Sequence, residues 1–134
     1  MGPETLENEI NWEVFVGRFV SGTLKAEEWT HQAHLAVAAW FISRYPAIEA
    51  GVRIRTGIRH LNECLGGVNS ASRGYHETLT EFWILEVRSH LAEHGAGLES
   101  IRLLTQLPAG LWKKYYTIDL PKSRVARRQY IPHA

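Results

Sequence analysis

The sequence has little of several features that would assign a chain to a familiar class. It contains a single cysteine, Cys64, so no internal disulfide can form, and we expect a reducing cytoplasmic location. Fifteen Lys and Arg residues stand against fourteen Asp and Glu residues, which leaves no broad basic field for nucleic acid or lipid head groups. The longest unbroken apolar run, Leu35 to Ile42, is far shorter than the roughly 20 residues of a membrane-spanning helix. We therefore expect neither nucleic acid nor a membrane as a partner.

Several motifs with a known chemical role are also missing. The chain has no Gly-rich phosphate loop, no serine nucleophile elbow, no paired cysteines and no His-Glu-x-x-His run. Nucleotide-dependent chemistry therefore has no support. The first residues also lack the cationic start and apolar middle of a secretory signal.

What is present indicates one helical domain. The 134 residues are 45% hydrophobic and 22% charged, as is usual for globular proteins, and they suffice for one core but not for two. Apolar residues recur at helical spacing, and strand-like alternation is scarcely visible. The pattern predicts helices over residues 7–20, 30–45, 47–65, 75–94 and 98–107, with short helical turns at 25–29, at 111–116 and after Pro121. We expect an all-α fold, a single compact bundle of four to five main helices followed by short C-terminal helical turns.

Two of the predicted inward faces begin with histidine, and this is the central observation. His31 and His34 are three residues apart, so both rings project from one side of the same predicted helix. His76 heads the inward face of the 75–94 segment. Because an unpartnered buried imidazole costs on the order of 1 to 3 kcal/mol, three such rings need partners.

A divalent metal would satisfy all three rings. Neutral imidazole nitrogen is a common ligand of transition metals, and open metal sites in bundles are built from facing helices. We therefore predict that His31, His34 and His76 hold zinc or iron, with nickel and copper also compatible. The competing interpretation is that each histidine is bonded within the core to a carbonyl group.

Glu77 follows His76 directly, and three roles are open to it. It could act as a metal ligand, and a set of two histidines and Glu77 would leave open coordination positions that suit ferrous iron and oxygen chemistry. It could instead lie over a metal-bound water as a general base. The third possibility is a first-turn carboxylate that interacts with the helix dipole.

Other polar and aromatic side chains are candidates for contacts with a ligand. Arg127 lies in a basic tail, and it could fold back and bind a carboxylate or phosphate. The alternative is that the charges of this tail are simply solvated. Asn62 and Tyr116 could line a pocket. Trp29 and Trp83, beside the histidines, could form walls of a small cavity.

Two short boxes of sequence carry a resemblance. Residues 29–35 read Trp-Thr-His-Gln-Ala-His-Leu, and residues 75–78 read Tyr-His-Glu-Thr. This pairing resembles a group of small bacterial all-helical proteins with a Trp-Thr-His-x-x-His-Leu box and a Tyr-His-Glu-Thr box. The resemblance implies that both boxes contribute to one site, and it names no reaction.

The sequence therefore suggests a metal-dependent enzyme that acts on a small, anionic molecule by hydrolysis, hydration or oxygen activation, with Glu77 as its catalytic group. Two alternatives remain open at this stage. One is a non-catalytic module, such as a sensor, that binds a metal or another ligand. The other is a plain helical interaction domain with bonded core histidines. Whether the chain is an enzyme is not decided by its residues.

Overall fold

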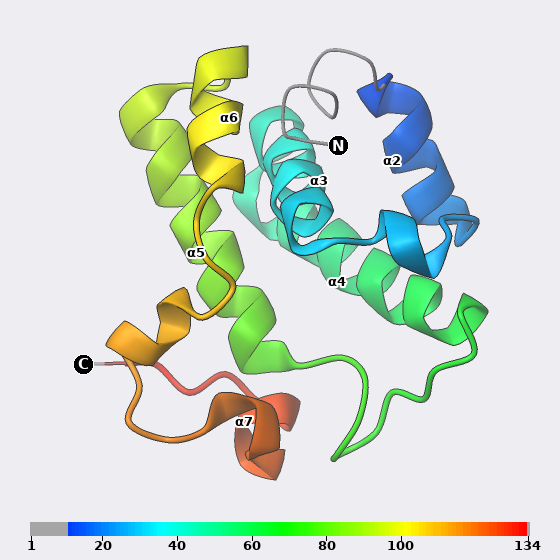
Figure 1. Cartoon of the computed structure of the whole chain (residues 1–134), viewed down its shortest axis with the longest axis vertical. Coiled ribbons are helices and arrows are strands. Elements are labelled where there is room, and N and C mark those ends of the chain that lie inside the picture. The colour runs from blue at the N-terminus through cyan, green and yellow to red at the C-terminus, as the bar shows by residue number, and fades with distance from the viewer. Residues whose placement is uncertain (1–10, 134) are drawn as a thin grey trace.

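The computed structural model describes residues 11–133, and within them all regular structure is helical. This confirms the all-α prediction (Figure 1). The α-helices are α2 (Trp12–Ser21), α3 (His31–Arg44), α4 (Ala47–Cys64), α5 (Glu77–His94), α6 (Leu98–Thr105) and α7 (Arg124–Arg128). Three short 3-10 helices are η1 (Ala26–Glu28), η2 (Leu111–Lys114) and η3 (Leu120–Lys122).

Side-chain caps fix the starts of several helices. Asn11 caps α2 and Thr30 caps α3, each accepting a hydrogen bond from a backbone N–H three residues later. Residues 7–10 of the first predicted segment lie outside the described residues. The prediction of a helix from residue 75 is wrong at its start. His76 is extended, with φ −131° and ψ 110°, and its ring caps α5, which begins at Glu77.

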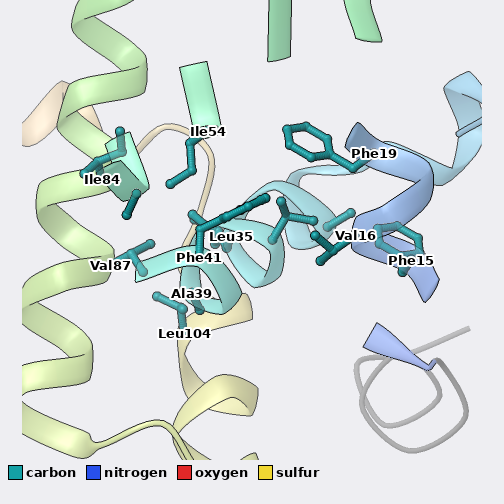
Figure 2. Packing of buried hydrophobic residues seen from close by; sticks show 14 of the residues in the cluster. Phe15, Val16, Phe19, Leu35, Ala39, Phe41, Ile54, Ile84, Val87 and Leu104 are labelled. Atoms are coloured by element: carbon teal, nitrogen blue, oxygen red, sulfur yellow. The ribbon is translucent and has the colours of Figure 1, made fainter. Parts of the chain in front are cut away.

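Helix α3 lies at the centre and packs against α4, α5 and α6, while α2 packs on α4 and α7 packs on the start of α5 (Figure 1). The main core joins α2, α3, α4, α5 and α6 through buried apolar side chains such as Phe19, Leu35, Phe41, Ile54 and Ile84 (Figure 2). Burial of this kind supplies most of the stability of a helical bundle, at about 25 cal/mol per Å² of apolar surface. A second cluster, formed by Phe82, Trp112, Leu120 and Ala126, attaches the C-terminal turns to α5.

The close approach of α2 to α4 depends on Gly57. A Cβ at that position would lie 2.2 Å from the ring of Phe19, so a side chain there would displace the ring. The absence of a side chain at Gly57 thus leaves room for the ring of Phe19 between the two helices. Among the described helices, none combines the length and the apolar character that crossing a membrane requires.

Candidate functional site

A cavity of about 680 Å³ lies between α3, α4, the start of α5 and the loop that joins α4 to α5. Most of its lining is apolar and comes from different helices, including Phe19, Leu35, Ile54, Ile58, Leu79 and Trp83. The polar lining residues are His31, His34, Asn62, Arg73, Tyr75, His76 and Thr80. Cavities of this size with a few polar groups are typical of small-molecule sites.

All three predicted histidines line this cavity, as does Trp29 beside them. His34 donates from Nδ1 to the carbonyl oxygen of Thr30 at 2.6 Å, and its ring stacks on Trp29. Burial lowers the pKa of His34 to about 4, against an ordinary value of 6.5, so the ring is neutral near pH 7. With the proton on Nδ1, the second nitrogen, Nε2, is a hydrogen-bond acceptor.

His31 is held by a residue far along the chain. Its Nε2 lies 2.8 Å from the carbonyl oxygen of Leu107, to which it can only donate, and its ring meets Trp83 edge-on with centroids 5.0 Å apart. The ring therefore connects α3 to the segment after α6.

His76 uses both ring nitrogens inside the protein. Nδ1 accepts the backbone N–H of Leu79 at 3.1 Å, which requires Nδ1 to be unprotonated, and Nε2 donates to the carbonyl oxygen of Leu120 at 2.6 Å. Burial lowers the pKa of His76, which keeps the ring in the neutral form that this pair of bonds needs. The ring is thus a helix cap and an anchor for η3.

These contacts do not fit the predicted metal site. Each of the three rings is bonded to a backbone carbonyl, and His76 has no nitrogen left for a metal. Within residues 11–133, no three or more His, Cys, Asp and Glu side chains are grouped so that they could hold a metal ion. The metal site stays a prediction that this geometry does not support, and the alternative of bonded core histidines describes the contacts better.

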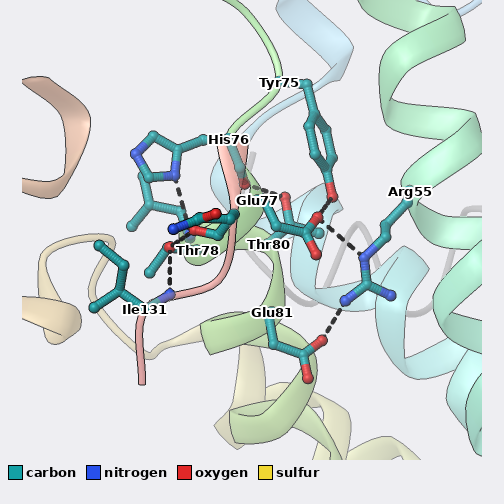
Figure 3. A network of polar contacts seen from close by, with 10 residues as sticks. Arg55, Tyr75, His76, Glu77, Thr78, Thr80, Glu81 and Ile131 are labelled. Atoms are coloured by element: carbon teal, nitrogen blue, oxygen red, sulfur yellow. Dashed lines mark hydrogen bonds and ion pairs between the residues drawn. The ribbon is translucent and has the colours of Figure 1, made fainter. Parts of the chain in front are cut away.

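Glu77 lies in the first turn of α5 and belongs to an ion network rather than to the cavity lining (Figure 3). Its Oε1 accepts the hydroxyl of Tyr75 at 2.5 Å and the Nε–H of Arg55 at 3.2 Å. The same guanidinium also pairs with Glu81. Burial, followed by the bond to Glu77, raises the pKa of Tyr75, so its hydroxyl stays protonated and points at the carboxylate. Glu77 therefore positions Tyr75, which does line the cavity.

The loop wall of the cavity is held by Asn69. Its Oδ1 accepts hydrogen bonds from Asn62 Nδ2 at 3.2 Å and from the backbone N–H of Tyr75 at 2.9 Å, while its Nδ2 donates to the carbonyl oxygen of Arg59. Asn62, predicted as a pocket residue, thus lines the cavity and also joins α4 to its loop.

The other two predicted ligand contacts lie elsewhere. Arg127 does fold back, but its donors go to backbone carbonyl oxygens: Nη1 bonds Gly74 at 2.6 Å and Nη2 bonds Pro121 at 2.8 Å. Tyr116 donates to the carbonyl oxygen of Ile131 at 2.6 Å and packs in the second cluster. Neither residue is among those that line the cavity.

Arg73 and Val68 are lining residues that the sequence reasoning missed. Both lie in the irregular loop after α4, where apolar periodicity gives no signal. A positively charged residue two positions before the Tyr-His-Glu-Thr box was the one available clue for Arg73.

Comparison of the chain with models of protein families, with curated proteins and with solved structures gives no match. The cavity is therefore interpreted from its own residues.

Proposed function

We propose that this protein is a ligand-binding module whose cavity between α3, α4 and α5 takes a small molecule with a largely apolar body. The observation that carries the proposal is the cavity itself, about 680 Å³ in a domain of 134 residues, with walls that are mainly apolar. A ligand that removes 100 Å² of such wall from water contributes about 2.5 kcal/mol, before the costs of association are subtracted.

Polar groups at three places support an oriented ligand. His34 offers Nε2 as an acceptor, because Nδ1–H is already bonded to Thr30. Asn62 offers its side-chain oxygen, because its Nδ2 is bonded to Asn69. The Tyr75 hydroxyl donates to Glu77 and retains the capacity to accept. A few fixed polar groups in an apolar cavity give a ligand its orientation and specificity.

The competing interpretation is a helical interaction domain with bonded core histidines. The carbonyl bonds of His31, His34 and His76 agree with it equally well. It does not account for the cavity, however, because a domain that needed these rings only for packing would fill the space beside them.

The test uses N-phenyl-1-naphthylamine, a neutral apolar dye whose fluorescence rises when it leaves water. We expect saturable binding to the whole protein, with energy transfer from tryptophan. Ala38→Phe fills the cavity from α3 and should abolish binding, whereas Ala47→Phe, at an exposed position on α4, should leave it unchanged.

Because a larger side chain at buried Ala38 could impair folding, Val68→Trp provides a second block. Val68 lines the cavity from the loop and is 55% exposed, so the change does not disturb the core. Dye binding that neither Ala38→Phe nor Val68→Trp reduces would contradict the proposal, as would the absence of saturable binding.

A further inference from the structure

We infer that the cavity selects molecules with a single anionic group, and that Arg73 at its mouth binds that group. This inference rests on the proposed function and adds the chemical class of the ligand: an apolar body inside the cavity and an acid group, such as a carboxylate, at the opening.

The charge that lines the cavity is positive. Of the described residues that line it, Arg73 alone carries a permanent charge, and none is Asp or Glu. Glu77 and Glu81, which directly follow the lining residues His76 and Thr80, are both paired with Arg55. An apolar cavity with one cation at its edge favours a ligand of the opposite sign over a neutral or cationic one of the same shape.

The guanidinium of Arg73 is available to a ligand. Among the described residues, this guanidinium makes no hydrogen bond or ion pair, in contrast to those of Arg55 and Arg59 on α4. Arg55 is bound to two carboxylates, and the guanidinium of Arg59 lies 4.3 Å from the ring centroid of Tyr75. A guanidinium presents its donors as a planar fork that matches a carboxylate.

Backbone hydrogen bonds hold Arg73 in place. Ser70 forms a turn around it: Ser70 N donates to the carbonyl oxygen of Arg73 at 2.8 Å, and Ser70 Oγ accepts the N–H of Arg73 at 3.2 Å. On the other side, the carbonyl oxygen of Gly74 accepts from Arg127 at 2.6 Å. Hydrogen bonds therefore hold the loop backbone on both sides of Arg73.

The exposure of Arg73 suits an amphiphilic anion. Arg73 is exposed, whereas the apolar walls formed by Leu35 and Ile84 are buried. A ligand could place its body against those walls and keep its acid group partly hydrated at the opening. That arrangement avoids the large cost of taking a carboxylate out of water.

The test compares two dyes that differ by one acid group. 8-Anilinonaphthalene-1-sulfonate carries a sulfonate, and N-phenyl-1-naphthylamine is the same molecule without it. Both are titrated into the wild-type protein, Arg73→Gln and Arg128→Gln. Arg128 is exposed on α7 and is not among the lining residues, so Arg128→Gln makes the same change in net charge away from the cavity.

We expect Arg73→Gln to weaken binding of the anionic dye roughly tenfold, as for loss of a charged hydrogen bond, and to change that of the neutral dye by less than about twofold. Arg128→Gln should leave both dyes unchanged. An anionic dye that binds Arg73→Gln as tightly as wild type overturns the inference while the neutral dye still supports the cavity. If neither dye binds saturably, the proposed function and the inference both fail.

A displacement series then tests the carboxylate itself. Decanoate should displace the neutral dye from wild-type protein at lower concentration than 1-decanol does, and this advantage should disappear in Arg73→Gln. Equal potency of the acid and the alcohol on the wild-type protein would contradict selection of an anion.

Discussion

The imidazole of His34 lies face to face with the indole of Trp29, with ring centroids 3.8 Å apart and planes inclined by 27°. Both rings line the cavity, and the imidazole donates from Nδ1 to the Thr30 carbonyl oxygen. Because the pKa of His34 is lowered to about 4, the folded protein keeps this wall uncharged under conditions in which a free histidine would titrate.

The first prediction concerns stability against pH. Between pH 6.5 and pH 4 the unfolded chain protonates His34 while the folded protein does not, so stability is fully present above 6.5 and falls as the pH drops towards 4. We expect the contribution to be on the order of 2 kcal/mol. Urea unfolding across this range measures the free energy of unfolding of wild type and of His34→Phe. The stability of the wild type relative to His34→Phe should decrease as the pH falls. An imidazole that titrates near 6.5 in NMR spectra would show the prediction to be wrong.

The second prediction concerns the cap at His76. His76→Ala removes the acceptor for Leu79 N–H and leaves the buried Leu120 carbonyl oxygen without its donor, so we expect a loss of about 2 to 3 kcal/mol. His76→Asn can restore the cap but not the long-range bond and should lose about half as much. Chemical denaturation measures both variants.

A chelator gives the matching control for His76. If the ring is bonded as described, metal chelation leaves the melting temperature of the wild-type protein unchanged. A chelator that destabilises the wild type as much as His76→Ala does would restore the metal interpretation.

The third prediction concerns the loop wall. Gly74 has φ +80°, and a Cβ there would lie 2.3 Å from the carbonyl oxygen of Val68. Gly95 also has φ +80°, but nothing lies within 4 Å of its Cβ position. Gly95→Ala should therefore cost about 1 to 3 kcal/mol from backbone conformation alone, since Gly95 has ψ −173°, and Gly74→Ala should cost more because of the added contact. Only Gly74→Ala should also weaken dye binding; equal losses of stability would rule out the close contact.

The fourth prediction concerns Arg55. Arg55→Met leaves Glu77 and Glu81 adjacent and unpaired, and we expect a loss of about 1 to 2 kcal/mol, since these side chains are about a quarter exposed. Arg53→Met breaks the exposed pair with Glu49 and should change stability by less than about 0.5 kcal/mol. Adding Glu81→Gln to Arg55→Met should recover part of the loss. A double variant no more stable than Arg55→Met would argue against charge repulsion.

The fold could be predicted because the residues that end its helices act locally. Pro46, the pair Gly66-Gly67 and Gly95 end helical segments through backbone restrictions that act within a few residues. The predicted and observed bounds of α3 and α4 therefore agree within one residue. The start of α5 was misplaced because His76 fits the helical spacing, yet its ring bonds backward as a cap.

The site could be predicted only in part. The sequence prediction assigned His31, His34 and His76 to one site, and all three line the same cavity. Their partners could not be foreseen, because Leu107 and Leu120 lie far along the chain from His31 and His76, and no periodicity connects them. Glu77 was given three roles, and the observed first-turn position agrees with the third, with Arg55 as the partner that sequence spacing could not supply.

The most direct test of the cavity is an NMR titration of the five tryptophan indole N–H signals with N-phenyl-1-naphthylamine. Trp29 and Trp83 line the cavity, Trp12 and Trp40 do not, and Trp112 borders a separate hollow beside Tyr116. Ring currents of a bound dye should shift the signals of Trp29 and Trp83 and leave those of Trp12, Trp40 and Trp112 in place. Shifts confined to Trp112, or spread evenly over all five signals, would contradict binding between α3, α4 and α5.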